Sequence, residues 1–250
     1  NNHVFHTVLV KACATLLGNE PWVLRLPAFA AGVTMIPATY VVGRRLFGQA
    51  TAYVGAALVS TAGALALYST NARGYTMVCL ATLILAYLLL RLRERPSIML
   101  WMMSPLVTAL GLWTVPVMLF PAGGLLLWFT LSALAGDTRG RRVDLARLAV
   151  AIAATAILTL LFYWPIIDQS GVNPLTANSF VRASPWRVFF TELASSIKEV
   201  FVEWSLGVPI AVSVALGVCA LIGLIRERHI SGLRVSIAGS MCVWCALLLL

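Results

Sequence analysis

The sequence is poor in charged residues, which make up only 11% of its 250 positions. A soluble domain carries about 25% charged residues, so this deficit excludes an ordinary soluble protein. Hydrophobic residues account for 60% of the chain, and the mean hydropathy is +0.92. The composition is that of an integral membrane protein. The chain lacks an initial Met, shows no signal peptide from Asn1 and ends in an apolar run. We therefore expect both ends to be cut from a longer protein.

The sequence also lacks a pattern of metal ligands. His3 and His6 are three residues apart, which suits one helical face for binding a metal or a substrate hydroxyl, but no third ligand is in reach. Cys242 and Cys245 have CxxC spacing without a partner pair. We interpret the cysteines as small hydrophobic residues: Cys13, Cys79, Cys219, Cys242 and Cys245. No metal site is predicted from the residues, and dependence on a divalent metal as cofactor is left open.

Long apolar runs are abundant instead. Eight are long enough, or nearly so, to cross about 30 Å of hydrocarbon: 24–42, 50–69, 76–90, 97–113, 116–135, 147–166, 207–225 and 235–250. The stretch 98–135 is too long for one crossing, and a proline disfavours helix in the residue before it, so we place a turn at 113–116. The predicted fold class is all-α, a polytopic transmembrane helical bundle of about eight spans in a single domain, 1–250.

Acidic residues are scarce: nine Asp and Glu stand against 18 Lys and Arg. Twelve of the basic residues lie in four short connections on one side of the predicted membrane: 43–49, 91–96, 136–147 and 226–234. The other side has six: Lys11, Arg25, Arg73, Arg182, Arg187 and Lys198. Lys and Arg concentrate in cytoplasmic loops, so the first side is expected to be cytoplasmic. Topology thus explains the basic surplus, and we expect membrane lipids rather than nucleic acid as partners.

Two amphipathic helices are expected on the outer face, lying in the membrane interface. The first, 1–18, begins at a capping Asn2 and ends at Gly18. Its apolar stripe has helical spacing: Val4, Phe5, Val8, Leu9, Ala12 and Leu16. The second, 185–204, lies in the outer loop 167–206. It either roofs the active site and shapes acceptor access, or serves only as an interfacial brace.

A short polar break, residues 68–76, separates the apolar runs 51–67 and 77–90. Arg73 is its only charge, on the side where arginine is scarce. A guanidinium beside hydroxyl groups and a glycine suits a phosphate, which it can bind with two parallel hydrogen bonds. Alternatively, Arg73 snorkels to water or to ordinary lipid headgroups. Arg25 presents the same choice between an anchor and a second anion contact.

Three motifs resemble those of a known family, in the same order and at roughly the same spacing. They are Arg-Leu-Pro-Ala at 25–28, Gly-Arg-Arg-Leu-Phe-Gly at 43–48 and Asn-Ala-Arg-Gly-Tyr-Thr-Met at 71–77. With Asn1-Asn2-His3 before an amphipathic helix, they resemble the N-terminal part of glycosyltransferase family 39-like proteins. These are the dolichyl-phosphate-mannose protein mannosyltransferases and their bacterial relatives in the GT-C superfamily. The resemblance covers about residues 1–90.

The resemblance implies a glycosyltransferase that moves a sugar from a polyprenyl-phosphate carrier to an acceptor, usually with inversion. It implies an active site on the extracytoplasmic face, here of a bacterial plasma membrane. Arg73 would stabilise the departing phosphate, with Tyr75, His3 and Arg25 as substrate-binding neighbours. The family's catalytic carboxylate lies just after its first membrane helix, upstream of the position of Asn1. We therefore expect this fragment to lack it, and neither Glu20 nor Asp168 sits in the matching motif.

Two other function classes remain as alternatives. The first is a transporter or flippase for an anionic lipid or solute, and the second is a non-catalytic membrane scaffold. Transporters tend to carry ionisable groups or broken helices near the middle of the membrane. Here the predicted spans are almost free of acidic residues, and polar residues gather at their outer ends. The pattern favours chemistry at the membrane interface.

Overall fold

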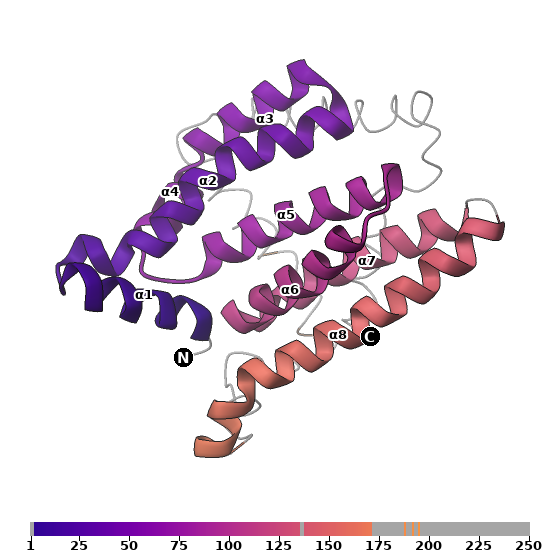
Figure 1. Cartoon of the computed structure of the whole chain (residues 1–250). Coiled ribbons are helices and arrows are strands. Elements are labelled where there is room, and N and C mark those ends of the chain that lie inside the picture. The colour runs from indigo at the N-terminus through magenta and orange to yellow at the C-terminus, as the bar shows by residue number, and fades with distance from the viewer. Residues whose placement is uncertain (1–2, 136–137, 172–187, 189–191, 193–194, 196–250) are drawn as a thin grey trace.

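The structure is a computed structural model that describes residues 3–135, 138–171, 188, 192 and 195. Every regular element in this part of the chain is helical, so the all-α fold class is confirmed. The elements are α1 (Val4–Leu17), α2 (Pro21–Phe47), α3 (Gln49–Thr61), α4 (Gly63–Thr70), α5 (Tyr75–Glu94), α6 (Ile98–Thr114), η1 (Pro116–Met118), α7 (Leu119–Leu134) and α8 (Thr138–Ser170) (Figure 1).

Four helical segments among the described residues are long and apolar enough to cross a membrane: α2, α5, η1 with α7, and α8. A fifth exists if α3 and α4, which are bent by 55° at their junction, count as one broken span. The 17-residue α6 is a shorter apolar helix. The predicted number of about eight spans is therefore not confirmed. The last two predicted spans, 207–225 and 235–250, lie outside the described residues.

The predicted turn at 113–116 is confirmed. Helix α6 ends at Thr114, and Val115 is extended, with φ −151° and ψ 130°. Pro116 then opens η1. The proline ring disfavours the helical conformation at the residue before it, and here Val115 is extended, so α6 and α7 follow each other with almost no loop.

Helix α8 is longer than the sequence suggested. It runs without interruption from Thr138 to Ser170, so it includes most of the predicted loop 136–147. Arginine is a good helix former, so the helix continues beyond its apolar centre. It ends at Gly171, whose φ of 68° suits glycine. Residues 167–170 of the predicted outer loop 167–206 therefore belong to α8, and of its predicted helix, 185–204, the structure describes only residues 188, 192 and 195.

The first helix starts slightly later than predicted. Helix α1 begins at Val4, with His3 in the capping position and no side-chain cap bond. The predicted cap, Asn2, lies outside the described residues. The predicted end is confirmed, because Gly18 adopts a φ of 91° directly after Leu17. A left-handed glycine is a common way to stop a helix.

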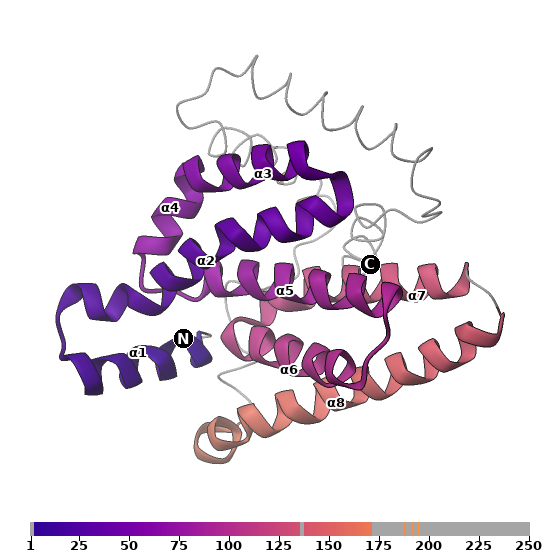
Figure 2. The same cartoon turned by 45° about the horizontal axis from the view of Figure 1, so that its top comes forward.

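The helices are arranged in successive layers, which both views show (Figures 1 and 2). Helix α2 packs on α3 and α4 on one side and on α5 on the other. Helix α5 contacts α6 and α7, and α8 covers α6 and α7 from the far side. Helix α1 lies beside the first part of α2 and also touches α6. Its start lies at the end of the bundle where α5 begins, because His3 is hydrogen-bonded to Gly74 there.

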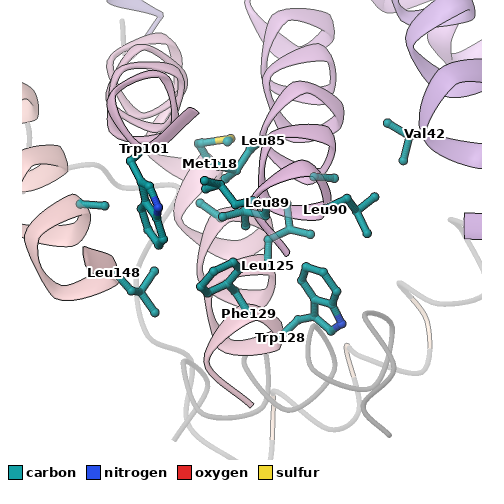
Figure 3. Close-up of a cluster of buried hydrophobic side chains, with 14 of the residues drawn as sticks. Val42, Leu85, Leu89, Leu90, Trp101, Met118, Leu125, Trp128, Phe129 and Leu148 are labelled. Carbon is teal, nitrogen blue, oxygen red and sulfur yellow. The ribbon is translucent and has the colours of Figure 1, made fainter. Parts of the chain in front are cut away.

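The main hydrophobic core lies where α5, η1 and α7 meet, and Figure 3 shows it. Its most buried members are Leu85, Leu89, Met118, Leu125, Trp128 and Phe129, each at most 1% exposed. The Trp101 ring packs edge-on against Phe129 at a centroid distance of 5.6 Å, which joins α6 to this core. This packing fixes the axes of the central helices and thereby the positions of their ends.

Three of the four arginine-rich connections, 43–49, 91–96 and 136–147, meet at one end of the bundle; the fourth, 226–234, lies outside the described residues. Arg45 of α2 pairs with Glu94 of α5 at 2.6 Å, and Arg93 pairs with Asp144 of α8 at 3.2 Å. Arg93 also donates to the Ser132 carbonyl of α7 at 3.2 Å. The other end of α5, at Tyr75, is about 30 Å away for a helix of this length. The polar break therefore lies at the opposite end of the bundle from the arginine pairs.

Candidate functional site

The polar break is a short non-helical connection between α4 and α5. Helix α4 ends at Thr70, and the Arg73 amide donates to the Asn71 carbonyl at 2.6 Å, which turns the chain sharply. Helix α5 then begins at Tyr75. The Arg73 side chain is exposed and forms no ion pair within the described part of the chain. Its guanidinium is therefore available to an anionic ligand.

The start of α1 closes over this connection. The backbone N–H of Gly74 donates to Nδ1 of His3 at 3.3 Å. The His3 ring packs edge-on against Tyr75 at a centroid distance of 4.9 Å, and Tyr75 in turn packs against Tyr68 at 5.2 Å. The structure thus brings His3, Arg73 and Tyr75 together from two segments about 70 residues apart. We call these three residues the Arg73 cluster.

Charge and burial act together on His3. Burial lowers the pKa of this imidazole, and the nearby Arg73 guanidinium lowers the pKa further. His3 is therefore neutral at pH 7. Because its Nδ1 accepts the Gly74 N–H, the ring proton must sit on Nε2. The Nε2–H group can donate to a hydroxyl or phosphate oxygen held beside Arg73.

Gly74 has no room for a side chain. A Cβ built at this position would overlap the Cγ2 methyl of Thr114 and would lie 3.4 Å from both His3 Nδ1 and His6 Cβ. Thr114 is held in place because its hydroxyl donates to the Leu110 carbonyl at 2.7 Å. Glycine is needed here because the ends of α1 and α6 approach the backbone closely. The sequence analysis noted this glycine in the polar break, but it did not show that Thr114 and His6 contact it in space.

His6 lies beside Gly74, next to the cluster, and is only 3% exposed. Its Nε2 has no hydrogen-bond partner among the described residues. Burial lowers the pKa of His6, with a smaller contribution from His3. Within the described chain, no third His, Cys, Asp or Glu joins the two histidines in a metal-binding group. Of the polar residues of α1, the two histidines thus turn toward the protein, whereas Thr7, Lys11 and Thr15 are exposed. Val8 and Leu16 of the predicted apolar stripe are exposed as well.

Arg25 does not join the other predicted site residues. It is exposed on α2, and across the described residues no hydrogen bond, ion pair or ring contact connects it to His3, Arg73 or Tyr75. One turn further along α2, the Ala28 carbonyl accepts a hydrogen bond from the buried Thr76 hydroxyl at 3.0 Å. Helix α2 thus supports the start of α5 through its backbone, not through Arg25.

An aromatic stack that the sequence did not reveal holds this end of the bundle together. Trp113 lies between Phe5 and Phe162, with centroid distances of 5.2 and 4.9 Å and interplanar angles of 25°. The Tyr163 hydroxyl donates to the Leu112 carbonyl at 3.0 Å. These contacts join α1, α6 and α8. Aromatic residues at the ends of apolar runs were the only signal, and that signal is equally typical of residues facing the membrane interface.

The chain matches the model of a known protein family. The family model for dolichyl-phosphate-mannose-protein mannosyltransferases matches residues 4–164. The match runs from the start of α1 almost to the end of α8 and includes Arg73 and Tyr75. It extends well past residue 90, where the motif resemblance stopped. Neither curated proteins nor solved structures gave a match to the chain.

Proposed function

Because the chain belongs to the dolichyl-phosphate-mannose-protein mannosyltransferase family, a GT-C family, we propose that it transfers a sugar from a polyprenyl-phosphate carrier at the Arg73 cluster. Family membership by itself identifies an integral membrane glycosyltransferase that uses a lipid-linked sugar donor. The polyprenyl carrier, the residues of the site and the side of the membrane are our proposal.

One observation carries the proposal: Arg73 is exposed and unpaired within the described chain, whereas the described arginines that form ion pairs lie at the opposite end of the bundle: Arg45, Arg91 and Arg93. An unpaired guanidinium near the membrane surface attracts the phosphate of a lipid-linked donor. The fork of N–H groups can bind two phosphate oxygens at once. The carrier's apolar chain would remain in the bilayer.

The chemistry follows from where charge develops. As the glycosidic bond breaks, negative charge builds up on the departing phosphate, and a donor fixed beside it lowers the barrier. Arg73 supplies that donor. His3 offers its Nε2–H from a ring fixed by Gly74, and Tyr75 is held between His3 and Tyr68. These neighbours would orient the sugar or the phosphate while Arg73 carries the charge.

The site is proposed to face the extracytoplasmic side of a bacterial plasma membrane. Arginine-rich ends of membrane helices face the cytoplasm, and the Arg73 cluster lies at the other end. The catalytic carboxylate stays a prediction, placed before Asn1. Within the described chain, no hydrogen bond or ion pair links Glu20 or Asp168 to the cluster, so neither is proposed for that role.

The test is sugar transfer by the complete enzyme carrying Arg73→Ala, assayed with a polyprenyl-phosphate-linked sugar donor. Removing one donor to developing charge costs about 10²- to 10³-fold in turnover. Arg73→Lys keeps the charge but not the fork, so it should fall between wild type and Arg73→Ala. The control is Arg44→Ala, which removes an equal charge from an exposed position on α2 at the arginine-paired end.

Normal turnover in Arg73→Ala would refute the assigned role. Equal losses in Arg73→Ala and Arg44→Ala would show a general effect of charge instead of a site. Movement of the lipid-linked donor from one leaflet of a vesicle membrane to the other, without sugar transfer, would favour the flippase alternative. The structural feature that fits this alternative is the 55° bend between α3 and α4, because transporters often contain broken helices.

A further inference from the structure

A groove of about 670 Å³ lies between α6 and α8, away from the Arg73 cluster. It starts near the arginine-rich end, and its walls are almost entirely apolar. Residues on both sides line it, among them Ser97, Trp101 and Pro105 on the α6 side, and Arg147, Ala151 and Leu158 on α8. On α8, alanines occupy positions 146, 151 and 154 of the lining. Their short side chains leave a channel where larger side chains would contact α6.

The length of the groove matches one leaflet of a bilayer. From Arg147 to Leu158 the helix advances about 16 Å, at about 1.5 Å per residue. Half of a hydrocarbon core of about 30 Å is about 15 Å. Since α8 is one of the segments that can cross a membrane, the groove reaches from the membrane surface to its middle. A single acyl chain has this length and this polarity.

One charged residue lines the groove: Arg147, at the end of the groove nearest the arginine-rich end of the bundle. Arg147 is exposed and makes no ion pair within the described chain. The two described carboxylates of this end are already paired: Glu94 with Arg45, and Asp144 with Arg93. Arg147 therefore has an unbalanced positive charge beside an apolar channel.

We propose that this groove binds one acyl chain of an anionic phospholipid whose phosphate pairs with Arg147. Basic positions between membrane helices on the cytoplasmic side bind acidic headgroups, and a guanidinium binds phosphate oxygens in pairs. The occupant is a lipid of the leaflet at the arginine-rich end. It is distinct from any donor at the Arg73 cluster, which lies at the opposite end of α5. The proposal does not depend on the proposed function.

The test uses the complete protein in detergent, titrated with dioleoylphosphatidylglycerol or dioleoylphosphatidylcholine and followed by native mass spectrometry. The wild type should retain the anionic lipid more tightly than the neutral one. Arg147→Gln should lower the apparent affinity for phosphatidylglycerol about fivefold, the effect of one surface arginine on an acidic lipid. Arg142→Gln, which removes an equal charge from an exposed residue of α8 outside the groove, should bind as the wild type does.

A second pair of variants tests the acyl channel without changing charge. Ala154 lines the groove and Ala153 does not. Ala154→Phe should fill the channel and abolish the preference for phosphatidylglycerol, whereas Ala153→Phe should keep it. A thermal melt of each variant shows that it is folded.

Three results would overturn the proposal. Equal losses of affinity for phosphatidylglycerol in Arg147→Gln and Arg142→Gln would mean that the lipid is attracted by the overall positive charge of this end and is not bound at the groove. Unchanged lipid retention in Ala154→Phe would mean that no chain enters the groove. A stable dimer in which Ala154 is protected from labelling would mean that a second protein copy covers this face.

Discussion

The backbone N–H of Gly74 donates a hydrogen bond to Nδ1 of His3, with 3.3 Å between the two nitrogens. This bond joins the first turn of α1 to the residue that follows Arg73. It fixes the orientation of the imidazole and leaves Nε2–H as its donor. The proposed phosphate site is therefore assembled only when α1 docks against the start of α5.

Gly74→Ala should disrupt the site, because the new Cβ overlaps the Thr114 methyl and crowds His3. Overpacking of this kind costs about 1–3 kcal/mol. We expect a lower melting temperature and a loss of sugar transfer. Thr114→Ser removes the methyl and keeps the hydroxyl bond to Leu110, so the double variant should recover both properties in part.

Gly63→Ala is the matched control for Gly74→Ala. Gly63 opens α4, and a Cβ there meets nothing within 4 Å. This variant should keep wild-type activity and melting temperature. Full activity in Gly74→Ala alone would show that the close approach to Thr114 is not needed for function.

The Thr76 hydroxyl anchors α5 to α2 through the Ala28 carbonyl at 3.0 Å, and the residue is 1% exposed. Thr76→Val keeps the shape and removes this bond, which is worth about 0.5–1.5 kcal/mol. We expect a fall of a few degrees in melting temperature. Thr34→Val is the control, because the exposed Thr34 hydroxyl bonds only within its own helix, to Ala30. Equal effects of the two changes would contradict a special role for the α2–α5 bond.

Stability should fall as the pH is lowered from 7 to 5. The pKa values of His3 and His6 are below 6.5 in the folded protein, chiefly because of burial. The unfolded chain therefore binds more protons than the folded chain at these pH values, and protonation favours unfolding. Melting temperatures measured across this range should fall less steeply in His6→Leu. Parallel curves for the two proteins would show that His6 does not titrate on unfolding.

The two ends of α5 should be accessible from opposite sides of the membrane. In a cysteine-free background, Ala72→Cys places a thiol beside Arg73, and Gln49→Cys places one near the Arg45–Glu94 pair; both positions are exposed. A membrane-impermeant maleimide should label Ala72→Cys in intact cells and Gln49→Cys only after permeabilisation. Labelling of both, or the reverse order, would remove the basis for an extracytoplasmic site.

Much of the fold could be predicted because helices that cross a membrane are recognised by long runs of apolar residues. Apolar length marks the crossings, and the turn before Pro116 follows from local sterics. Helix ends were less predictable: α8 continues through a stretch that polarity suggested was a loop. Polarity marks where the hydrocarbon ends, but α8 continues until Gly171, whose φ of 68° takes the backbone out of the helical conformation.

Within the proposed site, the polar break with Arg73 was visible because a lone charge stands out between apolar runs. Its partners were not. Thr114 lies 40 residues further along the chain, and the spacing of His6 from His3 did not show that His6 is buried beside Gly74. Arg25 had the same sequence signal as Arg73 and yet contacts none of the cluster. Proximity of this kind depends on how helices cross, which a single sequence does not record.

By itself, the sequence determined that this protein is an α-helical membrane protein, which end of it is rich in arginine, and that Arg73 is the only charge in the polar break at residues 68–76. Each of these follows from transfer free energies and local backbone sterics, which act on residues close in the chain. Only the tertiary structure decided that α1 closes over the Arg73 connection, that Gly74 must be small and that α6 and α8 leave a groove between them. Those features depend on the close packing of side chains from distant segments, where a single methyl group decides whether two helices meet.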